Sequence, residues 1–581
     1  METVKIKING IEVETPKGST ILEAAHSAGI KIPTLCYLKG INAIGACRMC
    51  LVEVKGARAL AAACVYPVNE GMEVFTNTPT LRKSRQTTLE LLLSNHRSDC
   101  LSCVRNTDCE LQNLCREYNV DMHRFASDRT EPEIEQSTPH LVRDNSKCIL
   151  CRRCVAVCKK NQHVGVINVS KRGYQTHVGS AFDMPLGETA CVNCGQCISV
   201  CPVGALYEVD DTAKVWNAIA DPDKHVIIAP APSVRAQLGE CFGLPIGTNV
   251  EGKMIAALRR LGADKVFDVD AAADVTIMEE GTEFIHRLTE GGKLPMFTSC
   301  SPGWVKFLEE YYPEFIPNLS SCKSPQQMFG ALCKTYYAER AGIDPKDIFV
   351  VSVMPCTAKK FEISREDQAA AGVPDLDVSI TTRELADMIK HAGIDFNALP
   401  DETCDPLLGI ATGAGHIFGV TGGVMEAALR TVVEKVTGKP IDDPEFTAVR
   451  GVADIKEAEY DVGGTTVRVA VTSGLENAHK LLQMIKNGEK QYHFVEVMCC
   501  PGGCVNGGGQ PHQSGNTHNF VDLRAERAKA LYSEDAAMVL RKSHESPVVK
   551  ELYESYLGEP GSHKAHEILH TSYVARQIYN D

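Results

Sequence analysis

Residues 148–158 read CILCRRCVAVC, and residues 191–202 read CVNCGQCISVCP. Both runs have the spacing C-x2-C-x2-C-x3-C, with which thiolates hold [4Fe–4S] clusters. Where two such runs share a domain, the fourth cysteine of each run binds the other cluster, so we expect crossed ligand sets. The expected sets are Cys148, Cys151, Cys154 and Cys201 for one cluster, and Cys191, Cys194, Cys197 and Cys158 for the other.

The cysteine content indicates where and how the chain works. It has 581 residues, 25 cysteines and a formal net charge of −14. A chain of this length is too large for a small disulfide scaffold, so the cysteines point to metal ligands in a reducing cytoplasm. The negative charge argues against a nucleic-acid partner, and no apolar run approaches the roughly 20 residues of a membrane span. The opening METVKIKINGIEVETPKGST alternates like a strand pair around Asn-Gly, unlike a secretory signal.

A first group of ligands precedes the two runs. CYLKGINAIGACRMC and AAACVYP combine a long gap, a CxxC and a later single cysteine. This is the type of spacing that holds a [2Fe–2S] cluster, although the first gap is longer than in the C-x4-C-x2-C pattern. Zinc is the alternative, and the Gly-rich loop in a β-rich segment favours iron. The expected ligands are Cys36, Cys47, Cys50 and Cys64.

A second group lies in HRSDCLSCVRNTDC, residues 96–109. One imidazole and three thiolates can hold zinc tetrahedrally or a [4Fe–4S] cluster with one histidine ligand. The position between two iron–sulfur segments favours iron. The expected ligands are His96, Cys100, Cys103 and Cys109. Four clusters in succession would conduct single electrons, so we expect a reactive site at the end of this path.

From residue 211 the chain takes on an α/β pattern. Apolar runs such as KHVIIAPAPSVR and DIFVVSVMPC alternate with helical stretches such as EGKMIAALRRLG, as in parallel sheets buried on both faces. Cys300, Cys356 and the pair around Cys500 each follow such a run. Because ligands of open α/β sheets gather at the carboxyl ends of strands, we expect these cysteines to meet in one site.

Three motifs in this half resemble those of a known family. TSCSPGW (298–304), MPCTAKKFE (354–362) and EVMCCPGGCVNGGGQPH (496–512) are similar to the signatures of [FeFe]-hydrogenases, in the same order. The accessory cluster motifs match the larger clostridial-type members. The resemblance implies reversible 2H⁺ + 2e⁻ ⇌ H₂ with a ferredoxin or NAD(P)-linked acceptor. It also implies an H-cluster, a cubane [4Fe–4S] bridged by cysteine to a two-iron unit with CO, cyanide and a bridging dithiolate amine.

The expected architecture is multidomain. We expect a β-grasp [2Fe–2S] ferredoxin-type domain over 1–79, a [4Fe–4S] domain with one histidine and three cysteine ligands over 80–122, and a two-cluster α+β ferredoxin-type domain over 138–210. The resemblance implies a two-lobed α/β H-cluster domain over 211–515 and a helical C-terminal wrap over 516–581, similar to a separate small subunit. The expected cofactors are therefore one [2Fe–2S], three accessory [4Fe–4S] clusters and the H-cluster.

The resemblance assigns roles to residues around the H-cluster. Cys356, Cys500 and Cys504 are expected to bind the cubane, and Cys504 is expected to bridge it to the two-iron unit. Lys359 is expected to donate a charge-assisted hydrogen bond to a cyanide. Met354 and Met498 are expected to pack against the two-iron unit.

One position departs from the family pattern. The family motif is TSCCPGW, in which the first cysteine relays protons and the second is the fourth cubane ligand. Here the relay position is Cys300 and the ligand position is Ser301. Cys300 can shift to bind the cubane, Cys499 can reach in, or Ser301 can bind through oxygen. Because thiolate suits iron–sulfur clusters better than alkoxide, we favour a cysteine, with Cys300 first. The alternative for Cys499 is a buried spare thiol.

The resemblance also implies a proton relay that starts at Cys300. TIMEEGTEFIHRL supplies Glu280, Glu283 and Arg287, and NLSSCKSP supplies Ser320. Carboxylates three residues apart lie on one face of a helix, and such a face is ordinarily solvated. An efficient relay needs pKa values near the working pH, which burial would provide.

Two alternative functions and the partners remain open at this stage. One alternative is an electron-transferring subunit similar to the large iron–sulfur subunit of complex I, against which MPCTAKK and MCCPGGC argue. The other is a hydrogenase-like sensor, which Ser301 leaves open and the long cluster series disfavours. No flavin or NAD pattern is convincing. By analogy with NAD(P)-linked and electron-bifurcating complexes, we expect ferredoxin and/or flavin- and NAD(P)-binding diaphorase subunits as partners in a hetero-oligomer.

Overall fold

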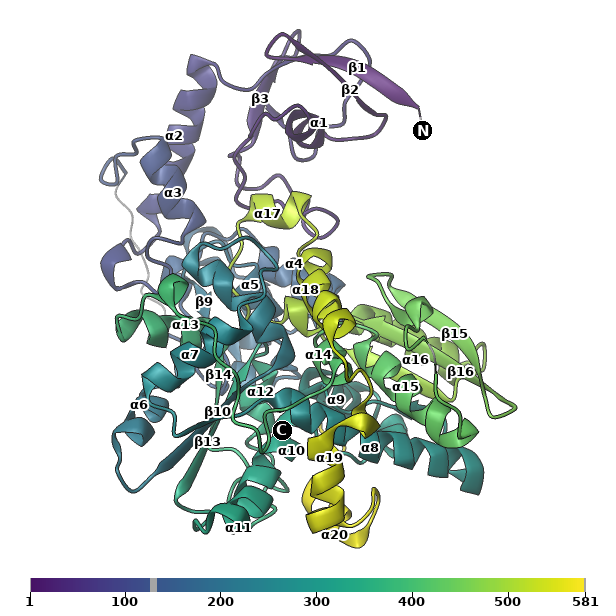
Figure 1. Cartoon of the computed structure of the whole chain (residues 1–581). Coiled ribbons are helices and arrows are strands. Elements are labelled where there is room, and N and C mark those ends of the chain that lie inside the picture. Colours follow the sequence, from purple (N-terminus) through teal and green to yellow (C-terminus); the bar gives the residue numbers. More distant parts are fainter. Residues whose placement is uncertain (1, 126–132, 442, 579–581) are drawn as a thin grey trace.

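The structure, a computed structural model, describes residues 2–125, 133–441 and 443–578 (Figure 1). The N-terminal domain stands at the top of Figure 1, away from residues 211–515, which are called the catalytic half after the activity that the resemblance implies. Helices α2 (Pro79–Ser94) and α3 (Glu110–Glu117) follow the N-terminal domain. Within the described residues, none of the helices is both long and apolar enough to cross a membrane.

The N-terminal domain is a five-stranded sheet packed on one short helix. The sheet order is β2 (Ile11–Pro16), β1 (Thr3–Ile8), β5 (Glu73–Phe75), β3 (Leu51–Val54) and β4 (Ala61–Ala62). β1 and β2 form the hairpin expected at Asn9-Gly10, where both residues have positive φ, as a two-residue turn of this kind requires. Helix α1 (Ile21–Ser27) begins with a capping box between Thr20 and Glu23.

The middle of the chain forms a small cysteine-rich domain. Helices α4 (Arg153–Lys160) and α5 (Gln196–Ser199) each begin within one of the two cysteine runs, and they pack on each other. β6 (Val142–Arg143) pairs with β9 (Leu206–Tyr207). The insertion between the runs forms a hairpin of β7 (Asn168–Ser170) and β8 (His177–Gly179).

The catalytic half contains two four-stranded sheets. In the first, β11 (Lys265–Val266), β10 (His225–Pro230), β13 (Ile348–Met354) and β14 (Val378–Thr381) are all parallel. In the second, β12 (Met296–Phe297), β17 (Phe494–Met498) and β16 (Thr465–Ser473) are parallel, and β15 (Ile455–Val462) pairs antiparallel with β16. The apolar runs of the sequence therefore form parallel strands, as predicted, except at β15.

Helices surround the two sheets. The long helix α8 (Val269–His286) is buried along most of its length and packs on α10 (Pro325–Leu332) and α15 (Gly423–Thr437). Helices α6 (Thr212–Ala220), α7 (Glu251–Leu261) and α13 (Thr382–His391) lie beside the first sheet, and α16 (Leu475–Lys486) lies beside the second (Figure 1).

The C-terminal segment, yellow in Figure 1, descends along the catalytic half. It contains α17 (Gly515–Phe520), α18 (Leu523–Ala537), α19 (Pro547–Leu552) and α20 (His563–Leu569). Its two ends are fixed by different contacts. The His26 and Phe520 rings stack at 3.5 Å against the N-terminal domain, and Lys323 N–H donates to Leu569 O at 2.8 Å. The segment therefore ties the outermost domain to the catalytic half.

The cysteine-rich domain is held against the catalytic half by close backbone contact. A Cβ placed on Gly508 would lie 2.6 Å from Gly195 Cα, which is closer than real Cβ contacts allow. Thr357 Oγ1 donates to Asn193 O at 2.8 Å, and Gln196 Nε2 donates to Asn506 O at 2.8 Å. The Gly-rich stretch after Cys504 thus permits close packing.

We expect Gly508→Ala to weaken this junction. The added methyl must displace backbone, and overpacking of this kind costs about 1–3 kcal/mol. Urea unfolding of the cluster-loaded chain measures the loss. Gly342→Ala is the control, because Gly342 has positive φ and no atom within 4 Å of an added methyl, so it carries backbone strain alone. A Gly508→Ala variant as stable as the unaltered chain would contradict a tight junction at Gly508.

Candidate active site

The N-terminal domain brings its four expected cysteine ligands together as two contacting pairs. Cys50 Sγ lies 3.3 Å from Cys64 Sγ, and a hydrogen bond with Cys36 lowers the pKa of Cys47 to about 6. Cys36, Cys50 and Cys64 are buried. Four thiols gathered in an apolar interior suit a bound metal cluster, because soft thiolates are ligands for iron–sulfur clusters.

The His96 group lies against the cysteine-rich domain. A Cβ on Gly204 would lie 2.5 Å from Cys103 Sγ, and Cys109 Sγ lies 3.7 Å from Pro202 O. Both neighbours belong to the chain just after Cys201, an expected ligand of the next cluster. The His96 group is therefore adjacent to that cluster.

The two cysteine runs lie together, so that the last cysteine of each run is near the first three of the other. Cys148, Cys151, Cys154 and Cys201 line one cavity of about 20 Å³. Burial and then Cys151 raise the pKa of Cys154, and burial and then Cys194 raise that of Cys197, which also faces Cys191 and Cys158. Buried thiols that repel one another as thiolates are stabilised when a metal neutralises them.

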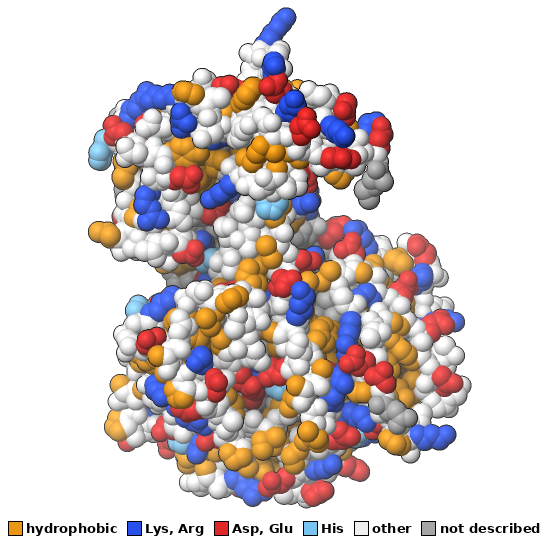
Figure 2. Space-filling model, turned by 45° about the horizontal axis from the view of Figure 1, so that its top comes forward, with side chains coloured by type: hydrophobic (Ala, Val, Ile, Leu, Met, Phe, Trp, Pro, Cys, Tyr) orange, Lys and Arg blue, Asp and Glu red, His pale blue; other side chains and the backbone are white. Residues whose placement is uncertain are grey.

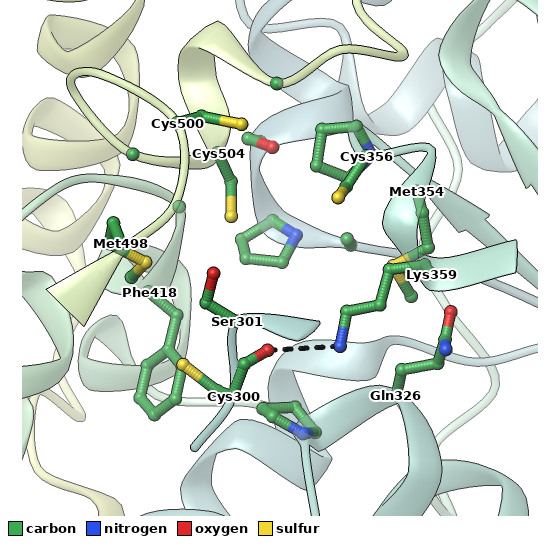
Figure 3. A pocket seen from close by; sticks show the side chains of 18 of the residues that line it. Cys300, Ser301, Gln326, Met354, Cys356, Lys359, Phe418, Met498, Cys500 and Cys504 are labelled. Carbon is green, nitrogen blue, oxygen red and sulfur yellow. Dashed lines mark hydrogen bonds between the residues drawn. The ribbon is translucent and has the colours of Figure 1, made fainter. Parts of the chain in front are cut away.

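A larger cavity of about 70 Å³ lies in the catalytic half, where strands of both sheets end (Figure 3). Cys356 follows β13, Cys500 and Cys504 follow β17, and Cys300 follows β12. The sulfurs of Cys356, Cys500 and Cys504 point toward a common space at the top of Figure 3. The expectation that distant cysteines meet at carboxyl strand ends thus agrees with the geometry.

The three candidates for the fourth cubane ligand occupy different places. In Figure 3, the Cys300 sulfur points away from the other three sulfurs and lies beside Phe418. The Ser301 hydroxyl points to the side of Cys504, and its Oγ accepts the Cys499 N–H at 3.1 Å. The Cys499 thiol hydrogen-bonds with the sulfurs of Cys194 and Cys500, so it lies between the cysteine-rich domain and the cavity.

The Lys359 ammonium is fixed at the wall of the cavity. Its Nζ donates to Ser324 Oγ and Glu362 Oε2, both at 2.8 Å, and to Cys300 O at 3.2 Å. The longest of these bonds is the dashed line in Figure 3. Met354 and Met498 line the same cavity and are each 2% exposed.

The expected proton-transfer groups form a contiguous series behind Cys300. Glu280 is 1% exposed, so it is not part of a solvated helix face. Burial, and then the charge of Glu283, raises the pKa of Glu280 to about 8, although Ser320 and the Ser299 N–H oppose the shift. Burial and then Glu280 raise the pKa of the Cys300 thiol.

The series continues through Ser320 to Glu283. Ser320 Oγ donates to Glu283 Oε2 at 2.8 Å, and Arg287 Nη2 donates to Glu283 Oε1 at 2.5 Å. The Ser321 N–H also donates to Glu283, at 3.0 Å. All five groups named for the relay, Cys300 through Arg287, are therefore neighbours.

Sequence reasoning missed several groups next to this series. Glu279 is buried on α8, and Tyr553 and His570 of the C-terminal segment both hydrogen-bond with it. Glu283, Cys322 and His570 each place one atom within 4.8 Å of the others. The only sequence signal is a histidine pair four residues apart, His566 and His570, which no local pattern connects to α8.

We expect Glu280 to be protonated at pH 7 and to lose its proton as the pH rises through about 8. The raised pKa means that the neutral carboxyl predominates below that value. Difference infrared spectra should show a buried carboxyl C=O band at pH 7 that fades between pH 7 and 9 and is absent in Glu280→Gln. Glu283→Gln should retain the band but lose it at lower pH, because this change removes the charge of Glu283 that helps to raise the pKa of Glu280. A band unchanged in Glu280→Gln would contradict this assignment.

Comparisons with known proteins agree with these motifs. The chain matches the C-terminal domain of the iron only hydrogenase large subunit over residues 224–508 and the iron hydrogenase small subunit over 521–576. A 2Fe-2S iron-sulfur cluster binding domain matches 1–79, and a 4Fe-4S dicluster domain matches 147–205. Residues 85–124 match the NADH-ubiquinone oxidoreductase-G iron-sulfur binding region.

Whole proteins are similar over most of their length. The NADP-reducing hydrogenase subunit HndD of Solidesulfovibrio fructosivorans is 49% identical and covers 99% of this chain and 100% of its own. Iron hydrogenase 1 of Clostridium pasteurianum is 45% identical over 98% of this chain and 99% of its own. A solved structure of the [FeFe]-hydrogenase HydA1 from Chlamydomonas reinhardtii is 43% identical with a TM-score of 0.57, covering 64% of this chain and 100% of that one. The chain therefore belongs to the [FeFe]-hydrogenase family, as an oxidoreductase acting on H₂ with iron–sulfur clusters and an H-cluster domain.

Proposed function

We propose that this chain is the hydrogen-converting subunit of a larger electron-transfer complex, with one [2Fe–2S], three accessory [4Fe–4S] clusters and an H-cluster. The observation that carries the proposal is the cavity of Figure 3, with three converging cysteine sulfurs on one side and the Cys300–Glu280 pair on the other. When bound, the H-cluster supplies the site at which H₂ is formed or split. The protein supplies ligands, a dry cavity and a proton path.

The cavity residues suit this cofactor. Three thiolates are the soft donors that an iron–sulfur cubane requires. Met354, Met498 and Phe418 give the remaining wall an apolar character, and Lys359 provides a fixed positive charge for an anionic ligand. Water is thereby kept from a site in which charges change.

We assign the fourth cubane position to Ser301. The sequence favours Cys300, but its sulfur points away from the other three, whereas the Ser301 hydroxyl points to their side. Ser301 is also the N-cap of α9 (Pro302–Tyr311), and its hydroxyl caps no backbone N–H of that helix. An anionic oxygen at this position is stabilised by the helix N-terminus and by the Cys499 N–H.

A cluster-reconstitution experiment tests this assignment. The chain is loaded anaerobically with iron and sulfide, without the two-iron unit, and its clusters are counted by Mössbauer and EPR spectroscopy. We expect Ser301→Ala to lose one [4Fe–4S] cluster while the accessory clusters remain as internal standards. Ser301→Cys should keep it with altered spectra.

Cys499→Ala is the matched variant on the other side of the same hydrogen bond. It retains the backbone N–H and should retain all clusters. Loss of the cubane in Cys499→Ala with its retention in Ser301→Ala would assign the ligand to Cys499 instead. Infrared bands of CO and cyanide that shift under H₂, after maturation with the two-iron unit, test the hydrogenase reaction itself.

The contacts between ligand groups support a branched electron path. Asn42 Nδ2 donates to Cys36 O at 2.8 Å and to Cys151 O at 3.1 Å, which links the outermost group to the first crossed set. The His96 group meets the same set at Gly204. The second crossed set reaches the cavity, because Cys499 contacts both Cys194 and Cys500.

In the proton path, Cys300, Glu280, Ser320 and Glu283 exchange protons in that order. Arg287 has a different role, because a guanidinium keeps its proton in proteins. Arg287 donates to Glu283 and to the carbonyl oxygens of Asn318 and Leu319. It therefore positions Glu283.

The proposed partners are ferredoxin and/or flavin- and NAD(P)-binding diaphorase subunits in the cytoplasm. Apolar side chains are exposed beside the outer ligand groups, with Leu101 95% and Val104 57% exposed next to Cys100 and Cys103. On the face in Figure 2, basic and acidic side chains alternate instead of forming one basic field. These features suit a protein partner better than nucleic acid.

We expect a flavoprotein to co-purify with the tagged chain from its native host, and NAD(P)H-linked H₂ formation to require that fraction. The physical reason is that a two-electron carrier needs a flavin to feed single-electron clusters. Leu101→Lys should reduce this co-purification, and Val539→Lys, which changes a residue 96% exposed in the C-terminal segment, is the control. Full activity of the lone chain with NAD(P)H would contradict the proposal.

A further inference from the structure

The C-terminal segment places a histidine at the outer end of the proton path. Residues 569–571 run beside residues 321–323, with Lys323 N–H donating to Leu569 O and Thr571 N–H to Ser321 O, both at 2.8 Å. The side chain of His570 is 7% exposed. One of its ring nitrogens, Cys322 Sγ and a Glu283 carboxylate oxygen lie within 4.8 Å of one another. A proton acceptor from the small-subunit-like segment thus reaches the relay.

Both nitrogens of His570 are held in defined orientations. Nε2 lies 3.1 Å from Glu279 Oε2, and Nδ1 lies 2.8 Å from Ser321 Oγ. The Glu279 carboxylate accepts bonds from Tyr553 Oη at 2.5 Å and Gly561 N–H at 2.9 Å, so its position is fixed by the same segment. The tautomer with hydrogen on Nε2 donates to Glu279 and leaves Nδ1 to accept from the Ser321 hydroxyl.

The Glu283 side chain is 16% exposed, and a titratable group beside it adds a second route between the relay and solvent. Arg287 cannot release its proton, and the Ser320 and Ser321 bonds to Glu283 come from groups that donate to it. Imidazole is the side chain that ordinarily exchanges protons between pH 5 and 8. His566 is exposed on α20, and its ring lies against that of His570, with centroids 3.9 Å apart and the ring planes tilted by 33°. This ring pair leads from the buried side of the segment to solvent.

We propose that His570 exchanges protons with Glu283, and that His566 passes them between His570 and water. The inference rests on the proposed proton path from Cys300 to Glu283. For outward transfer, the Glu283 carboxyl gives its proton through the Ser321 hydroxyl to Nδ1 of His570. The resulting imidazolium then gives up its Nε2 proton, through water, to a ring nitrogen of His566, which releases it to solvent. No electrons move in this step, and the inward direction is its reverse.

Several elements of the fold contribute groups that face His570. The charged and titratable groups that face it are Glu279 and Glu283 from α8, Cys322 beside the relay, Tyr553 of η16 (Tyr553–Leu557) and His566 of α20. Arg287 lies one residue further away, because its guanidinium is paired with Glu283.

The test uses His570→Gln in the fully matured chain. A glutamine amide can still bond to Glu279 and Ser321 but cannot carry a proton. The control is His563→Gln, because the His563 side chain is 90% exposed on the same helix and its ion-pair partner is Glu567. Infrared CO and cyanide bands and cluster EPR signals confirm that each variant is loaded.

Two readouts are measured, the pH profile of H₂ formation between pH 5 and 9 and the rate at which the Glu280 carboxyl band responds to a pH jump. We expect His570→Gln to slow the band response at least about fivefold and to lower H₂ formation most at high pH, with partial rescue by added imidazole. KM for the electron donor and the His563→Gln variant should be unchanged. His566→Gln should give a smaller change in the same direction.

An unchanged band response and pH profile in His570→Gln would overturn the proposal. A uniform loss of activity at every pH, without imidazole rescue, would also overturn it and leave His570 a structural role. Failure of the underlying hydrogenase proposal is distinguishable, because the unaltered chain would then lack CO and cyanide bands that respond to H₂.

Discussion

The burial of thiols in sets is the constraint on which the rest of this structure depends. Burial raises the pKa of Cys154, Cys197 and Cys356, and their nearest charged neighbours are other cysteines. Without a metal, these groups remain neutral thiols, which form only weak hydrogen bonds with one another. With a cluster, the metal ions offset the thiolate charges and crosslink distant residues, so cluster binding and folding are coupled. The small cysteine-rich domain, with short helices and two-residue strands, depends on this crosslinking more than the catalytic half does.

In the proposed function, electrons and protons reach the cavity from different sides. Cys499 and Cys500 face the cysteine-rich domain through Cys194, whereas Cys300 faces Glu280 on α8. This separation follows from the fold. The cysteines come after the carboxyl ends of β12, β13 and β17, whereas Glu280 lies on helix α8, next to Cys300. Glycines at 195 and 508 let the electron side approach to backbone contact, which shortens the path between clusters. On the proton side, burial raises the pKa of Glu280 to about 8, close to the range in which a relay works best.

The sequence predicts the local parts of this arrangement and not the long-range parts. The cysteine spacings predict the crossed sets around Cys201 and Cys158, since a cluster needs ligands at fixed short separations. The Asn9-Gly10 hairpin and the parallel strands of the first sheet are predictable for the same local reasons. The orientation of Cys300 away from the other sulfurs and the contact of His570 with the relay depend on tertiary packing. No periodicity connects residues 321–323 with residues 569–571, although they lie side by side in the fold.

Ser301, which departs from the family motif, and Cys499 are linked by a hydrogen bond and are best considered together. A serine oxygen is a harder donor than a thiolate and holds more charge, so it needs compensation that a cysteine does not. Ser301 has that compensation from the start of the ten-residue helix α9 and from the N–H of Cys499. The Cys499 side chain, meanwhile, fills the space over Gly303, where a Cβ would lie 2.7 Å from its sulfur. The proposed oxygen ligation at Ser301 is therefore compatible with a buried cluster. It is supported by the start of α9 and by the N–H and side chain of Cys499. A substitution at position 301 or 499 should consequently change the environment of the other residue.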